Sequence, residues 1–183
     1  MSLKVAVVAG GDSAESAISR SSAHEVLLSL DERHVVELIE LDDSLTKNIT
    51  AFGPDVVFPV LHGPPGEDGT VQGYLEILGI PYVGSDVRGS ALAMDKYVAK
   101  TLFRKSRLPV LEDLLVSVDD VDEASAAISE RFGPSVVIKP LRQGSALGVT
   151  RLPDGGDMSE PIKRARRYGD TMLVEPYFEG KEV

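Results

Sequence analysis

The 183-residue sequence contains no cysteine, which excludes disulfide bonds and thiolate metal sites. Aromatic residues make up only 5% of the chain, and 19 basic residues face 29 acidic ones, giving a net charge of −10. Such a composition argues against nucleic acid and anionic membranes as partners. No apolar run approaches the ~20 residues that span a bilayer, and no basic segment followed by an apolar one opens the chain. We therefore expect a cytoplasmic protein that binds neither nucleic acid nor membrane.

The first third of the chain alternates short apolar runs with helical patterns. Residues 4–9, 35–41 and 56–61 have the length and branching of buried strands, while a helical pattern follows each of the first two. Strands that alternate with helices form parallel sheets through right-handed crossovers. The hydrophobic content of 43% is enough for real cores. The sequence predicts an α/β fold that begins with a small doubly wound parallel sheet.

The run HGPPGEDGTVQG, residues 62–73, follows the third predicted strand. Apolar residues at Val71, Tyr74, Leu75 and Leu78 keep helical spacing, so the run joins a strand to a helix. In such units the carboxyl end of the strand and the N-terminus of the helix border one crevice, where backbone N–H groups receive anions. We expect His62 to present its side chain there.

Two side chains of the first third are candidates for chemistry at this crevice. Glu15 follows Gly10 and Gly11, which do not complete the three-glycine dinucleotide fingerprint. Its carboxylate would hold a substrate ammonium there, or would only favour the helix start. His62 would shuttle protons or bind an anionic substrate, or would be a structural loop residue. The residues alone leave both alternatives open.

Beyond residue 85 the pattern changes, and a second domain begins near residue 86. A helix with Tyr97 on its apolar face precedes a strand at 114–118 and a helix at 121–132. Residues 136–140 form a strand, and the pattern resumes at 149–152 after a loop, which predicts a hairpin. A helical face around Ile162 then precedes a strand at 171–176. This part reads as an α+β arrangement.

Several residues of this second part suit a phosphate or a nucleotide. Lys139 ends an apolar strand, so its ammonium needs an anion or must reach solvent; Lys96 presents the same two alternatives. Loops of the kind at Gly144 and Ser145 offer backbone donors to phosphates. Carboxylates at Glu175 and Glu182 would accept hydrogen bonds from an adenine or a ribose, or would form an exposed acidic tail.

Taken together, these features resemble the N-terminal part of the D-alanine–D-alanine ligases, a family of the ATP-grasp superfamily. The run at 62–73 is the most specific of the matching blocks. Ser16, Ala17 and Gln143 depart from the family pattern, which we expect to alter local hydrogen bonding rather than chemistry. The matching blocks occur in family order and are residues 8–15 with Ser19, 62–73, 94–96, 137–149 and 173–182.

The resemblance implies an ATP- and Mg²⁺-dependent ligase of peptidoglycan synthesis, active on D-alanine and homodimeric. In the catalytic set, Glu15 would hold the ammonium of the first D-alanine, Ser145 would bond nearby, and His62 would lie beside the reacting carboxyl. Lys96 and Lys139 would contact the phosphates of ATP. The remaining ATP contacts would be a covering loop tip at Gly144 and Ser145, adenine binding by Glu175 with the backbone at Pro176 and Phe178, and ribose binding by Glu182.

The resemblance also implies three segments: an N-terminal substrate-binding domain at 1–85, a first ATP-grasp subdomain at 86–175, and the start of a second at 176–183. The C-terminal ATP-grasp subdomain, which holds the Mg²⁺ ligands, is missing, so no metal ligand is expected here. We expect the 183-residue chain to be inactive by itself. The alternatives are a D-alanine–D-lactate ligase and a naturally short, non-enzymatic module that binds a nucleotide or an amino acid.

Overall fold

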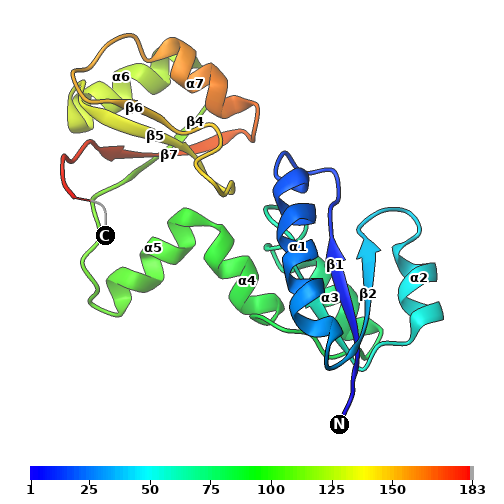
Figure 1. Ribbon diagram of the computed structural model, residues 1–183. Helices are drawn as coiled ribbons and strands as arrows, with labels where there is room; N and C mark the ends of the chain where they lie inside the picture. Colours follow the sequence, from blue (N-terminus) through cyan, green and yellow to red (C-terminus); the bar gives the residue numbers. More distant parts are fainter. Residues whose placement is uncertain (182–183) are drawn as a thin grey trace. The chain divides into compact units, whose positions relative to one another are not determined.

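The computed structural model describes residues 1–181, and it divides the chain into two compact units. The first unit comprises Met1–Leu92, and the second begins at Ala93. Each unit has its own sheet and its own hydrophobic core (Figure 1). Within the described residues, no helix is both long enough and apolar enough to cross a membrane. The two units are described separately below.

The first unit is built on a three-stranded parallel sheet in the order β2-β1-β3. Both faces of β1 are covered, because Val7 packs with Ala23 of α1 while Ala6 packs with Ile49 of α2 and Leu75 of α3. A strand buried on both faces must be apolar throughout, which explains the continuous run in the sequence. The elements are β1 (Lys4–Ala9), α1 (Ser16–Asp31), β2 (Val35–Glu40), α2 (Leu45–Phe52), β3 (Val56–Pro59), α3 (Thr70–Ile77) and α4 (Val87–Met94).

The second unit contains a four-stranded antiparallel sheet in the order β4-β7-β5-β6. Helices α6 and α7 lie together on one face of this sheet (Figure 1), where Ile128 and Ile162 join Ile138 of β5 in the core. Lys139 alternates with Ile138 and therefore points to the opposite face. The elements are α5 (Lys96–Lys105), β4 (Leu114–Ser117), α6 (Val121–Phe132), β5 (Val136–Pro140), β6 (Thr150–Leu152), α7 (Ser159–Arg166) and β7 (Thr171–Pro176).

The structure confirms the predicted α/β class, the parallel first sheet and the hairpin of β5 and β6. Two details differ from the sequence prediction. The short strand expected around Tyr82 forms only one bridge, to Val57, because Gly84 and Ser85 end the run at once. Helix α4 was not predicted, and Ser90 is its one buried residue, so it presents no wide apolar face to the core. The boundaries at 85/86 and 175/176 stay predictions.

Candidate functional site

In the first unit, Glu15 and His62 lie at the carboxyl edge of the parallel sheet. Glu15 occupies the position before α1, in the loop that follows β1, and His62 comes shortly after β3. Adjacent parallel strands deliver their following loops to the same edge, which brings the two residues together. Ser13 fixes the arrangement because its hydroxyl donates to the His62 carbonyl oxygen at 3.0 Å and accepts the Glu15 N–H at 3.3 Å. The sequence predicted this juxtaposition from topology alone.

Both side chains carry buried polar atoms without a hydrogen-bond partner among the described residues. Glu15 is only 4% exposed, yet no described residue donates a hydrogen bond to its Oε1 atom. The Nε2 atom of His62 is likewise buried and has no hydrogen-bond partner among the described residues. Ligand atoms of Glu15, His62 and Glu67 all lie within 4.8 Å of one another. Buried polar groups are normally hydrogen-bonded, so an unpaired pair of this kind marks a place for a ligand.

The loop at 62–73 is held in shape by its own polar contacts. Glu67 Oε2 accepts the Gly63 N–H at 2.7 Å, and Gln72 Nε2 donates to the Gly66 carbonyl oxygen at 2.9 Å. Gly69 has φ +95, and a Cβ there would meet the Val87 carbonyl oxygen at 2.6 Å, so only glycine fits. From its position in the sequence, Glu67 is expected to favour the start of α3; in the structure its carboxylate lies near Glu15 and His62 instead.

In the second unit, Glu175 of β7 is the centre of a buried charge cluster. It is 7% exposed, and its two carboxylate oxygens accept from Lys100 of α5 and Lys139 of β5. Lys100 also lies 3.2 Å from Asp113, which in turn pairs with Arg104. Burial alone would raise the pKa of Glu175, but the hydrogen bonds from both lysines outweigh it and lower that pKa. Glu175 is therefore held as a carboxylate.

These charged groups border a pocket of about 260 Å³ on the face of the sheet opposite α6 and α7. Burial, and next the positive charge of Lys139, lowers the pKa of the Lys96 ammonium in this pocket. Three ammonium groups thus share a pocket with one carboxylate. The lining residues are Ala93, Lys96, Ala99, Lys100, Phe103, Lys139, Leu173 and Glu175.

The loop between β5 and β6 is anchored at its base to the start of α5. The Lys96 N–H donates to the Leu141 carbonyl oxygen at 3.2 Å, and Lys96 Nζ donates to the Gln143 carbonyl oxygen at 2.5 Å. Arg142 Nε donates to Asp95 at 2.9 Å. At the tip Ser145 is exposed and has φ +44, a left-handed conformation that is uncommon outside glycine. The base is fixed while the tip stands in solvent.

The structure gathers the predicted residues into two groups, one in each unit. Glu15 and His62 form the first, while Lys96, Lys139 and Glu175 share the lysine pocket of the second. Gly144 and Ser145 belong to the anchored loop, and Pro176 and Phe178 lie at and just beyond the end of β7, where Phe178 is 74% exposed. Glu182 lies outside the described residues. The functional roles given to these residues stay predictions.

The sequence analysis missed Lys100 and Asp113. Lys100 follows Lys96 by four positions, and residues so spaced lie on one face of a helix. That spacing was the available signal for Lys100. The pairing of Asp113 with Lys100 and Arg104 depends on where the chain returns after α5, which no local pattern encodes.

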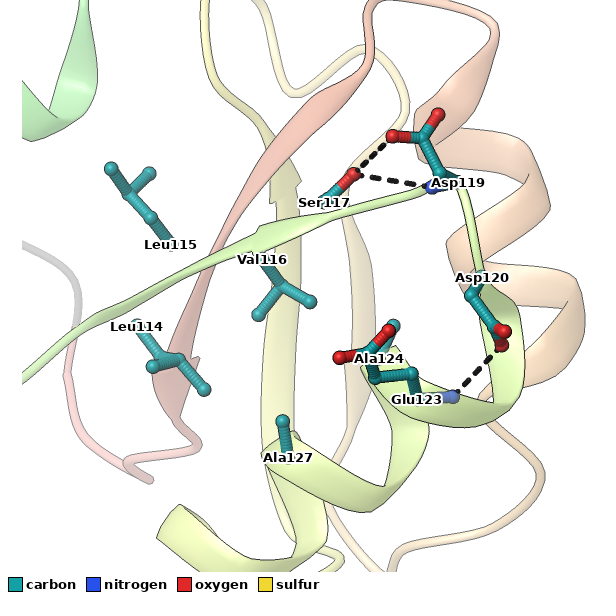
Figure 2. Close-up of a pocket in the computed structure, with 9 residues that line it drawn as sticks. All are labelled: Leu114, Leu115, Val116, Ser117, Asp119, Asp120, Glu123, Ala124 and Ala127. Carbon is teal, nitrogen blue, oxygen red and sulfur yellow. Dashed lines mark hydrogen bonds between the residues drawn. The ribbon is translucent and has the colours of Figure 1, made fainter.

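A further pocket of about 390 Å³ lies between β4 and α6 (Figure 2). Leu114, Val116 and Ala124 line it together with the carboxylates of Asp119, Asp120 and Glu123. Asp120 caps α6 by accepting the N–H groups of residues 122 and 123 at 2.9 and 3.0 Å. None of the predicted site residues that the structure describes borders this pocket, and its carboxylates would repel a phosphate. We assign it no part in the site.

Comparison with known proteins gives a consistent result. Residues 42–85 match the family model for the D-ala D-ala ligase N-terminus, and residues 102–183 match that for the D-ala D-ala ligase C-terminus. The D-alanine–D-alanine ligase of Halorhodospira halophila is 41% identical over 180 residues, and that of Granulibacter bethesdensis is 42% identical over 183. Each match covers 98% of this chain but only 57% and 58% of the relative.

Solved structures agree with these sequence matches. The D-alanine–D-alanine ligase of Coxiella burnetii is 30% identical with a TM-score of 0.81, covering 97% of this chain and 64% of its own. The Bacillus anthracis ligase complexed with ATP is 27% identical with a TM-score of 0.79, covering 98% and 60%. The chain thus spans about three fifths of the length of these relatives. Since the two family models together match more than half of its residues, the chain belongs to the D-alanine–D-alanine ligase family.

Proposed function

We propose that this chain is the N-terminal part of an ATP-dependent D-alanine–D-alanine ligase of peptidoglycan synthesis. In this reaction the γ-phosphoryl group of ATP passes to the carboxylate of one D-alanine and gives an acylphosphate. The amine of a second D-alanine then attacks the acyl carbon and displaces phosphate, which leaves the dipeptide. A carboxylate is a poor acyl donor until it carries such a leaving group, and cations must balance the charge of the transferred phosphoryl group.

The lysine pocket of the second unit is the observation that carries this proposal. Lys96, Lys100 and Lys139 bring three positive charges to a pocket with one carboxylate. Burial, and next the positive charge of Lys139, lowers the pKa of Lys96, and an anionic ligand would counteract both effects. The triphosphate of ATP supplies that anion, while Phe103 and Leu173 give the pocket an apolar lining suited to a base. One solved relative is complexed with ATP.

The charge cluster suggests different roles for Lys100 and Lys139 in nucleotide binding. The side chain of Lys139 is 27% exposed, whereas that of Lys100 is 10% exposed and also contacts Asp113. Lys139 would therefore exchange Glu175 for a phosphate oxygen, and Lys100 would keep Glu175 paired when it does. Gly144 and Ser145 would cover the phosphates. Glu175, with the backbone at Pro176 and Phe178, would hold the adenine, and Glu182 would bind the ribose.

Glu15 and His62 are proposed to hold the first D-alanine. The unpaired Oε1 of Glu15 suits the substrate ammonium, because a buried carboxylate without a partner gains a charge-assisted hydrogen bond. The unpaired His62 Nε2 would then meet the carboxyl end of the same amino acid. Ser145 would add a hydrogen bond nearby.

The family also implies Mg²⁺, which takes oxygen ligands in an octahedral arrangement. Among the residues that line the lysine pocket, Glu175 is the one carboxylate, and both of its oxygens are taken by lysines. The described residues of this pocket therefore do not fit a magnesium site. We assign the charge balance there to the lysines. A homodimer and a cytoplasmic location stay predictions from the resemblance.

Titration of the chain with ATP, followed by calorimetry, tests the nucleotide site. We expect saturable binding that Lys139→Met weakens by about 10- to 100-fold, since a charge-assisted contact contributes about 1.5–3 kcal/mol. Lys163→Met is the matched control, because Lys163 lies on α7 with its side chain 56% exposed. ATP binding that is absent, or equal in both variants, would refute the lysine pocket as the nucleotide site. The proposal also expects this chain to be inactive by itself. D-alanine-dependent phosphate release by the chain alone would contradict that expectation.

A further inference from the structure

We infer that Glu15, His62 and Glu67 form a binding site for a divalent transition metal ion, with Zn²⁺ as the best match. The three residues come from two loops: Glu15 lies in the loop after β1, while His62 and Glu67 lie in the loop between β3 and α3. One ligand atom from each lies within 4.8 Å of the other two. Such a site lies in the first unit and involves none of the residues in the lysine pocket.

The burial of the atoms is the second observation that points to a ligand. Glu15 is 4% exposed, and its Oε1, like His62 Nε2, is buried without a hydrogen-bond partner among residues 1–181. Both are lone-pair donors of the kind that coordinate metals when the imidazole is neutral. A cation between them would satisfy both at once. Mere clustering of acidic groups at a surface would not leave two such atoms buried and unpaired.

The set of donors decides which metal fits. One imidazole nitrogen and two carboxylate oxygens suit zinc, which binds with three protein ligands and leaves a fourth position open. Mg²⁺ prefers oxygen ligands alone in octahedral geometry, so the imidazole disfavours it. The two carboxylates also match the double charge of the ion, whereas a substrate ammonium neutralises only one of them.

The surrounding contacts hold the ligands nearly in place. Glu67 Oε2 accepts the Gly63 N–H at 2.7 Å, and the His62 carbonyl oxygen accepts the Ser13 hydroxyl at 3.0 Å. Hydrogen bonds from groups that do not contact the metal hold metal ligands in their orientation. Zinc bonds of about 2.0–2.1 Å require ligand atoms about 3.3 Å apart. The exposed Glu67 side chain supplies the small inward rotation that this demands.

Zinc at this position would exclude the amino acid substrate. The Glu15 and His62 atoms that would bind zinc are those proposed for the D-alanine ammonium and carboxyl group. Competition between zinc and D-alanine therefore rests on the proposed function, while metal binding itself does not. Zinc would then act as an inhibitor of the substrate site.

Titration of the chain with ZnCl₂ alone, followed by calorimetry, tests the metal site, with Co²⁺ absorption as the second probe of coordination. We expect one site, weakened by about 10- to 100-fold in His62→Gln and in Glu67→Gln. The chain has three histidines and no cysteine, so His24→Gln is a matched control; His24 is exposed on α1. Absent binding, or equal loss in the control, would overturn the proposal.

Glu67→Gln is the safer of the two variants because Glu67 is exposed, and circular dichroism confirms that each variant is folded. D-alanine added during the zinc titration should raise the apparent dissociation constant. Zinc binding that D-alanine leaves unchanged would overturn the competition and, with it, Glu15 as the ammonium site. Loss of zinc binding in His62→Gln would still support the metal site in that case.

Discussion

Among the residues that the structure describes, each unit of the molecule buries one glutamate, and the two have opposite surroundings. Glu15 is 4% exposed and has one oxygen to which no described residue donates a hydrogen bond. Glu175 is 7% exposed and has both oxygens bound by lysines. The first unit therefore leaves its carboxylate ready for an incoming cation. The second unit pairs its charges internally, so a ligand there must replace an existing partner.

The helix starts show the same contrast. In the first unit, neither Glu15 before α1 nor Gly69 before α3 supplies a side-chain cap. In the second, Asp95 accepts N–H groups at the start of α5, and Asp120 does so at the start of α6. The contrast is confined to these residues before the helices, because Asp68 accepts the Thr70 N–H at 2.9 Å in the first unit and Met158 supplies no side-chain cap to α7 in the second.

The largest expected effect comes from Lys100→Met, which removes the most buried cation of the paired cluster. Removing one partner of a buried ion pair costs about 3–5 kcal/mol, and we expect about 3 kcal/mol because Arg104 and Lys139 remain to pair with the carboxylates. Urea denaturation measures the loss of unfolding free energy. Lys105→Met, at an exposed position on α5, is the control and should change stability by less than about 0.5 kcal/mol. A loss below about 1 kcal/mol for Lys100→Met would contradict the tight pairing of the second unit.

At low pH, protonation of Glu175 should break its ion pairs with Lys100 and Lys139. The pKa of Glu175 lies below its usual 4.5, because the lysine hydrogen bonds outweigh the opposing effect of burial. The unfolded state therefore takes up the proton first, so the stability from Glu175 is complete above pH 4.5 and is lost as pH falls through the lowered pKa. Glu175→Gln should cost about 2 kcal/mol at neutral pH. The free-energy difference between wild type and variant should shrink below pH 4.5; a difference that stays constant into strong acid would be inconsistent with this origin.

The smallest effect, and one of opposite sign, is expected for Glu15→Gln. A neutral isostere removes a buried charge that has an unpartnered oxygen, so the unfolding free energy should rise by up to about 1 kcal/mol. Thermal and urea unfolding measure this change. Glu25→Gln, at an exposed position of α1, is the control with no expected effect. Destabilisation by Glu15→Gln comparable to that of Glu175→Gln would remove the contrast between the two units.

Local sequence patterns located most elements because hydrophobic period and turn residues act over neighbouring positions. The predicted strands at 4–9, 136–140 and 171–176 and the helix at 121–132 have the same bounds in the structure. Helix α4 escaped prediction because it presents no strong apolar face, and its one buried side chain belongs to Ser90. The predicted third strand ends at Pro59 instead of residue 61, where the chain leaves the sheet.

By itself, the sequence determined the fold class, the family and the residues that carry charge near the strand ends. Only the tertiary structure decided how those charges are used. Lys100 and Glu175 are 75 positions apart, and their pairing depends on how α5 packs against the sheet. Within the described part of the chain, Glu15 Oε1 and His62 Nε2 remain unpaired because the loops after β1 and β3 bury them without providing a partner. Hydrogen-bond satisfaction is a property of packed neighbours, so no local pattern of residues encodes it.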